Sequence, residues 1–99
     1  MASSVTSNFV FGDEAIGTAG TAEQVETTSY RISSLMIIAK DSNTGRIFYG
    51  GSDVASSTQR GLSAAESIVI TGTKPFDIAT IYVDCSVSGE GVDFVAARA

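Results

Sequence analysis

The chain has 99 residues, of which 43% are hydrophobic and only 17% are charged, and its net charge is −5. This length gives one domain with a modest core. The six basic residues are scattered, and phosphate backbones and anionic lipid surfaces require clustered cations, so we expect no nucleic acid and no membrane as partner. The sequence has no histidine, which excludes Ser-His-Asp and Cys-His catalysis and histidine-based metal sites.

The N-terminal part of the chain shows the weakest patterns. Residues 5–12 are predicted to begin with a strand, and residues 13–22 are loop-like, with a short helix over 13–16 as an alternative. Residues 23–30 are predicted as a polar strand at a sheet edge.

These patterns divide the chain into two parts. Residues 1–22 are predicted as an N-terminal arm with the first strand, partly irregular, and residues 23–99 as the β-sandwich domain. The first 30 residues either order on contact with a partner or form a frayed terminus.

The most apolar strand is predicted over residues 32–39. Five apolar residues follow one another from 35 to 39. Such a run predicts cover on both faces, or the core on one face and a partner on the other. Residues 40–45 are predicted as a turn with Gly45 in the left-handed conformation, and residues 46–50 as the returning strand.

The second half continues with short strands and turns. Residues 51–61 are predicted as a surface loop, residues 67–72 as a strand, and residues 73–79 as a connection that holds Pro75. Residues 80–97 are predicted as one β-hairpin with Gly89 and Glu90 at its tip.

In this hairpin register, Val83 faces Ala96 and Cys85 faces Phe94. The apolar side would carry Ile81, Val83, Cys85, Val87, Val92 and Phe94, and the wet side Tyr82, Asp84, Ser86 and Asp93.

Strands at this spacing predict an all-β fold, an antiparallel, jelly-roll-like β-sandwich of seven or eight short strands. The predicted core consists of Ile32, Leu35, Ile37, Ile47, Ile68, Ile70, Ile81, Val83, Cys85, Val92 and Phe94.

The residues offer little for catalysis or metal binding. Lys40 and Lys74 lie beside turns, where solvation leaves them unactivated. Asp84 and Asp93 would share the outward face of the hairpin, and Asp53 lies in a loop, but no calcium-binding string links them. We therefore expect no catalytic residues, no metal and no cofactor, and the protein is predicted not to be an enzyme.

Two residue types remain as candidates for a site. Tyr30, Tyr49 and Tyr82 could stack sugars on an exposed sheet face, although packing at a sheet or subunit boundary is the favoured interpretation. Cys85 is the single cysteine, so no internal disulfide can form, and a buried apolar role is favoured over a reactive thiol.

No targeting segment is evident in the sequence. The first fifteen residues lack the apolar stretch of a signal peptide, and no run approaches the ~18 apolar residues of a membrane span. We expect synthesis and use without secretion.

Part of the chain resembles a family of small structural proteins of tailed bacteriophages. The resemblance rests on the Asn-Thr-Gly turn at 43–45, the string at 47–54, the stretch at 61–68 and the closing segment at 81–92. The chain departs from the pattern at Ala64-Ala65-Glu66, where the family often has Pro-Gly-Glu.

The resemblance implies a virion component made in the host cytoplasm, and no catalytic residues are carried over from it. The expected function is a capsid decoration, or cement, protein that bridges and stabilises subunits of the major capsid protein. A homo-oligomer, a trimer in the family, would also bury the surplus apolar residues at 35–39. The alternative is a tail- or fibre-associated, glycan-binding sandwich module that uses Tyr82, Asp84 or the loop at 50–61.

Overall fold

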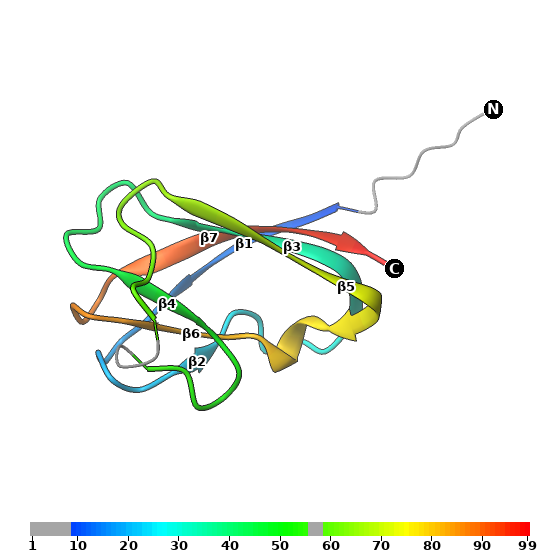
Figure 1. Cartoon of the computed structure of the whole chain (residues 1–99), viewed down its shortest axis with the longest axis horizontal. Helices are drawn as coiled ribbons and strands as arrows, with labels where there is room; N and C mark the ends of the chain where they lie inside the picture. The colour runs from blue at the N-terminus through cyan, green and yellow to red at the C-terminus, as the bar shows by residue number, and fades with distance from the viewer. Residues whose placement is uncertain (1–8, 56–58) are drawn as a thin grey trace.

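The computed structural model describes residues 9–55 and 59–99, which form a sandwich of two antiparallel β-sheets (Figure 1). This confirms the predicted all-β class. The elements are β1 (Phe9–Ala15), β2 (Glu23–Gln24), β3 (Arg31–Ala39), β4 (Ile47–Gly50), β5 (Ser67–Asp77), the 3-10 turn η1 (Ile78–Thr80), β6 (Tyr82–Cys85) and β7 (Gly91–Arg98).

The larger sheet has the strand order β1-β7-β3-β5, and the smaller sheet has the order β2-β6-β4. Every pair of neighbouring strands is antiparallel. The polar segment predicted at an edge does lie there, although its strand, β2, has only two residues.

The core fills the space between the sheets. Of the predicted core, Ile32, Leu35, Ile37, Ile47, Val83, Cys85, Val92 and Phe94 are buried, and Ile68, Ile70 and Ile81 pack against them at the margin. The sequence pattern missed Ile16, Val25 and Ile78, all fully buried outside the β-strands. All three belong to the buried core cluster.

The C-terminal hairpin prediction is wrong. β6 pairs with β2 and β4, whereas β7 pairs with β1 and β3, so the two segments lie in different sheets. A turn does fall at the predicted place, since Gly89 has a φ of +87°. The chain there crosses from one sheet to the other. Apolar alternation shows which side of a strand meets the core. It does not show whether two strands pair in one sheet or face each other from two sheets, because the alternation is the same in both cases.

This crossing also changes two burial assignments. Val87, expected on the apolar side, is 42% exposed, and Asp84, expected in solvent, is 2% exposed. Oδ1 of the Asp84 carboxylate accepts hydrogen bonds from the backbone N–H groups of Gly20 (3.0 Å) and Cys85 (2.8 Å). These two donors offset the loss of solvation.

The described part of residues 1–22 contains a strand, as predicted for that segment, and this strand lies in the sandwich. β1 runs from Phe9 to Ala15 and pairs along its whole length with β7, which excludes the helix considered over 13–16. Ile16 is fully buried. Residues 9–15 therefore belong to the larger sheet, and the arm expected within residues 1–22 falls partly on residues 1–8, which lie outside the described residues.

Gly45 has a different role from the one predicted. Its φ is not positive, but a Cβ there would collide with Oγ of Ser86 and lie 2.8 Å from Cγ2 of Val87. Among the described residues other than glycine, the left-handed conformation occurs at Ala65, in the turn before β5, where φ is 67°. This is the position at which the resembling family often has glycine.

The segment with Pro75 belongs to β5 and not to a connection. Ile32 pairs with Phe76 and Ser34 with Thr71, so residues 72–75 bulge out opposite the single residue Ser33. Proline fits a bulge on an edge strand because its missing N–H removes no ladder hydrogen bond.

Candidate interaction surface

The structure does not bring the candidate carboxylates together. Asp84 is buried in the smaller sheet, Asp93 lies on the outer face of the larger sheet, and Asp53 is exposed in the loop after β4. Among residues 9–55 and 59–99, no group of three or more histidine, cysteine or acidic side chains could hold a metal ion.

The tyrosines do not form one stacking platform. Tyr30 packs against the core beneath the Arg98 guanidinium, which lies 4.6 Å from its ring centre, and burial raises the pKa of its hydroxyl. Tyr49 packs against the core from the inner face of β4. Tyr82 lies opposite Gly50, one residue out of phase with the Tyr49–Val83 pair, so it points to the other face of the smaller sheet.

The single cysteine is buried, as predicted. Cys85 is 2% exposed, and its Sγ lies 3.9 Å from the backbone oxygen of Ile16. Burial is the main cause that raises the pKa of its thiol, and the Asp84 carboxylate adds to it. The thiol is therefore held in its unreactive protonated form.

One group of acidic residues was not anticipated from the sequence. Glu14 of β1 shares a side-chain hydrogen bond with Glu23 of β2, and Glu26 and Asp13 add their charges nearby. Burial and then the Glu23 hydrogen bond raise the pKa of Glu14 to about 7. Glu14 lies two residues after Gly12 and four after Val10, so it points to the same inner side of β1 as they do. This alternation in the sequence could have indicated that Glu14 is partly buried.

An exposed apolar surface lies on the outer face of the larger sheet, facing away from the smaller one. The pairing register arranges its side chains in rows that cross all four strands. One row is Phe9, Ala97, Ser34 and Thr71, and the next is Phe11, Val95, Met36 and Val69. We call these two rows the outer apolar face.

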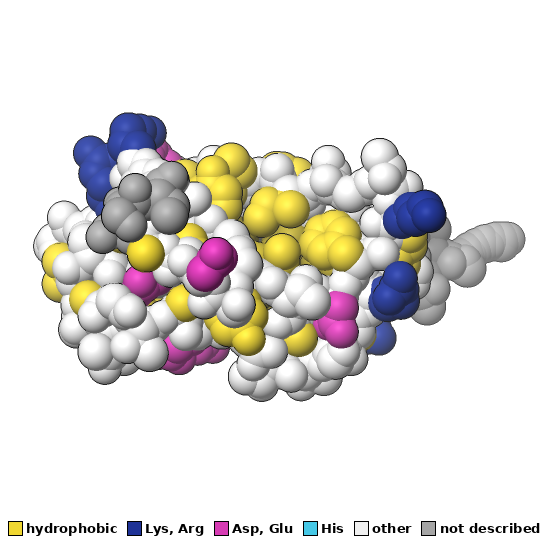
Figure 2. Space-filling view, turned by 60° about the horizontal axis from the view of Figure 1, so that its bottom comes forward, with side chains coloured by type: hydrophobic (Ala, Val, Ile, Leu, Met, Phe, Trp, Pro, Cys, Tyr) yellow, Lys and Arg dark blue, Asp and Glu magenta, His cyan; other side chains and the backbone are white. Residues whose placement is uncertain are grey.

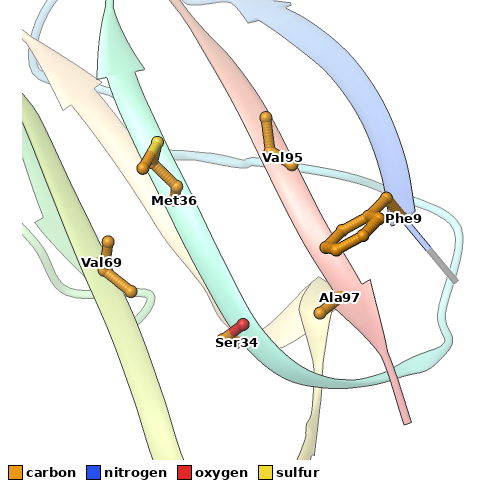
Figure 3. A pocket seen from close by; sticks show the side chains of 6 residues that line it. All are labelled: Phe9, Ser34, Met36, Val69, Val95 and Ala97. Carbon is orange, nitrogen blue, oxygen red and sulfur yellow. The ribbon is translucent and has the colours of Figure 1, made fainter.

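The outer apolar face contains no charged side chain, although an antiparallel sheet that faces water usually carries polar residues there. Phe11 is 71% exposed, Val69 55% and Met36 38%. Figure 3 shows six of the side chains around a hollow on this face, contributed by all four strands. The hollow has a volume of about 390 Å³ and is lined by Phe9, Ser34, Met36, Val69, Val95 and Ala97.

A charged group borders one end of this face. The next row contains Asp13, Asp93, Ile38 and Ser67. Nζ of Lys40 lies 2.6 Å from Oδ1 of Asp93 and 3.4 Å from Oδ2 of Asp13, so one cation joins two carboxylates that would otherwise repel each other. The apolar rows are thus limited at one end by a hydrogen-bonded polar rim.

A second apolar region lies along β5 at the side of the sandwich. Its hollow, of about 360 Å³, is lined by Ile70, Thr71, Gly72, Thr73, Lys74, Phe76 and Ile81. Figure 2 shows one face of the molecule on which hydrophobic side chains gather in the middle and basic side chains lie towards both ends. Ile70, Phe76 and Ile81 also pack against the core, so this region is the margin of the core.

The predicted continuous burial of residues 35–39 is resolved by this geometry. Leu35, Ile37 and Ala39 face the core, whereas Met36 and Ile38 face outwards. The core covers one face of this segment, and the other face is exposed as part of the outer face of the larger sheet.

Comparison of the chain with protein-family models, with curated proteins and with solved structures gives no match. Within the described residues, no helix has the length and apolar character needed to cross a bilayer.

Proposed function

We propose that the protein is a non-enzymatic virion structural protein, a capsid decoration protein that stabilises a shell of major capsid protein. The family resemblance over residues 35–99 suggests the virion. The outer apolar face is the observation that carries the proposal.

A sheet face of this kind is a surface for protein contact. Two rows across four strands are free of charge, and Phe11, Val69 and Met36 are substantially exposed. Contiguous exposed apolar surface on a small domain indicates binding to another protein surface. A compact sandwich with one such face can add many equal contacts to a shell, and these contacts reinforce one another when they are linked through an assembly.

Binding to assembled shells tests this proposal. We expect the protein to sediment with expanded capsids and not to bind isolated capsid-protein subunits, because a shallow surface gains affinity by joining several subunits whose placement exists only in the shell. Met36→Asp should reduce capsid occupancy, because it places a charge in the middle of the outer apolar face. Since the face is uncharged, raising the salt concentration should weaken binding little.

The matched control is Val87→Asp. It introduces the same charge at a residue that is 42% exposed and lies in the turn between β6 and β7. Equal occupancy of the two variants would overturn the outer apolar face as the functional surface, and absence of the wild-type protein from pelleted shells would overturn the decoration function itself.

A further inference from the structure

We propose that the outer apolar face binds a second copy of this chain, sheet against sheet, about a two-fold axis parallel to the strands. The proposed shell contact uses the same face, so a copy is either paired or bound to a shell, and the pair should form when no shell is present.

The two edges of the face are complementary in size. β1 carries the large aromatic side chains Phe9 and Phe11, and β5, at the opposite edge, carries the smaller Thr71 and Val69 in the same rows. A two-fold axis along the strands reverses the strand order and keeps each row in place. Each Phe11 then packs on Val69 of the other copy, and each large edge meets a small one.

The charges favour the same axis. With the rows kept in place, each row of Asp13, Asp93, Ile38 and Ser67 meets its own row in reversed order. Asp13 then lies over Ser67, and Asp93 over Ile38, so no carboxylate faces a carboxylate. An axis across the strands would instead place Phe9 over Phe11 and leave the β5 edges, with only Thr71 and Val69, too far apart to pack.

The face is small for a protein–protein contact. The two rows and the adjoining row of Asp13 span roughly six residues along each of four strands, so with strands about 4.8 Å apart and about 3.4 Å per residue the planar footprint is about 19 by 20 Å. This is less than the roughly 800 Å² per partner of a standard stable interface. We therefore expect a reversible contact that is seen only at high protein concentration.

Charge complementation between two variants tests both the partner and the axis. Phe11→Lys and Val69→Asp should each weaken self-association by about tenfold or more, because each puts a charge against an apolar side chain of the other copy. An equimolar mixture should regain association, since Lys at 11 of one copy then faces Asp at 69 of the other. The second contact in that mixed pair is unchanged, because Phe11 of the Val69→Asp copy packs on Val69 of the Phe11→Lys copy.

The measurement is sedimentation velocity over a concentration series, without shells, with thermal melting to confirm that each variant is folded. Val87→Asp, outside the face, should associate like the wild type. A wild-type chain that stays monomeric up to high concentration would overturn the pair, and a mixture that stays as weak as either variant alone would overturn the axis.

These outcomes are separate from those of the capsid experiment. A monomeric chain that still sediments with shells removes the pair and leaves the decoration function in place. A pair that forms while shells stay undecorated leaves the pair in place and removes the decoration function.

Discussion

At the scale of single residues, the core is built around the pairing of a glycine with an aromatic ring. Gly12 of β1 lies opposite Phe94 of β7, and a Cβ at Gly12 would lie 2.6 Å from Cζ of that ring. Phe94 is 2% exposed. The absence of a side chain at 12 therefore provides the space for the largest fully buried side chain of the molecule.

We predict strong coupling between these two residues. Phe94→Ala should cost about 3–5 kcal/mol of folding free energy, and Gly12→Ala about 1–3 kcal/mol through overpacking. In the Phe94→Ala background, Gly12→Ala should be neutral or stabilising by about 0.4–1 kcal/mol, because the new methyl has room and the unfolded chain loses entropy. Urea denaturation of the wild type, the two single variants and the double variant measures this coupling as a double-mutant cycle. The coupling would be contradicted if Gly12→Ala cost the same folding free energy with Phe94 and with alanine at position 94.

Glu14 gives the protein an unusual dependence of stability on pH. Its folded-state pKa is about 7, above the ordinary value of 4.5, because burial and neighbouring carboxylates disfavour the charged form. The folded chain therefore holds this proton more tightly than the unfolded chain. Stability should rise as pH falls from about 7 to 4.5, and should be lost as pH rises through 7.

Two other carboxyl groups act in the opposite direction at lower pH. A hydrogen bond from Ser29 is the main cause that lowers the pKa of Asp77, and hydrogen bonds from Thr44 and Gly45 lower that of Glu90. Their contributions are present above the unfolded pKa values and are lost as pH falls through the folded ones. The most stable pH should therefore lie near 5.

The variant Glu14→Gln isolates this effect. It should be more stable than the wild type at pH 8 and close to it at pH 5, because the amide is similar in size and carries no charge. Urea denaturation at a series of pH values provides the measurement, with the exposed Asp41→Asn as a control. If the free energy of unfolding changes with pH in the same way for the wild type and for Glu14→Gln between pH 5 and 8, Glu14 is not the source of the pH dependence.

At the scale of elements, β6 and β7 show that the same apolar alternation fits a hairpin and two strands in opposite sheets. Val83 and Cys85 in β6, and Val92 and Phe94 in β7, all point into the core, from opposite sheets. The link between them is joined to Ile16, the residue after β1, by hydrogen bonds from Ile16 N to Glu90 O and from Gly89 N to Ile16 O, each 2.8 Å. Neither strand provides the ladder partner of the other.

A peptide of residues 80–97 should therefore not fold as a hairpin. Its two strands find their backbone partners in β1 to β4, which the peptide lacks. Circular dichroism and proton NMR of the isolated peptide should show a disordered chain. NMR contacts between Val83 and Ala96 would contradict this prediction and support the simple hairpin register.

At the scale of the whole molecule, the two faces of the larger sheet have different tasks. The inner face forms the core with the smaller sheet, and the outer face exposes two apolar rows above a rim in which Lys40 joins Asp13 and Asp93. A lone small domain gains nothing in folding from apolar groups left in water. We propose an assembly role for the outer apolar face, and shell binding and self-association are its two direct tests.

The sequence by itself determined the class, the approximate strand positions and most of the core. Alternation at Leu35, Ile37, Val83 and Phe94 is a local property of the chain, and it defines the side that is buried whatever the neighbouring strand. Only the tertiary structure decided which strands are neighbours, because β1-β7 and β7-β3 pairing joins residues far apart in the chain. The outer apolar face depends on that decision: Phe11, Val95, Met36 and Val69 come from four separate segments, and only the register places them in one row.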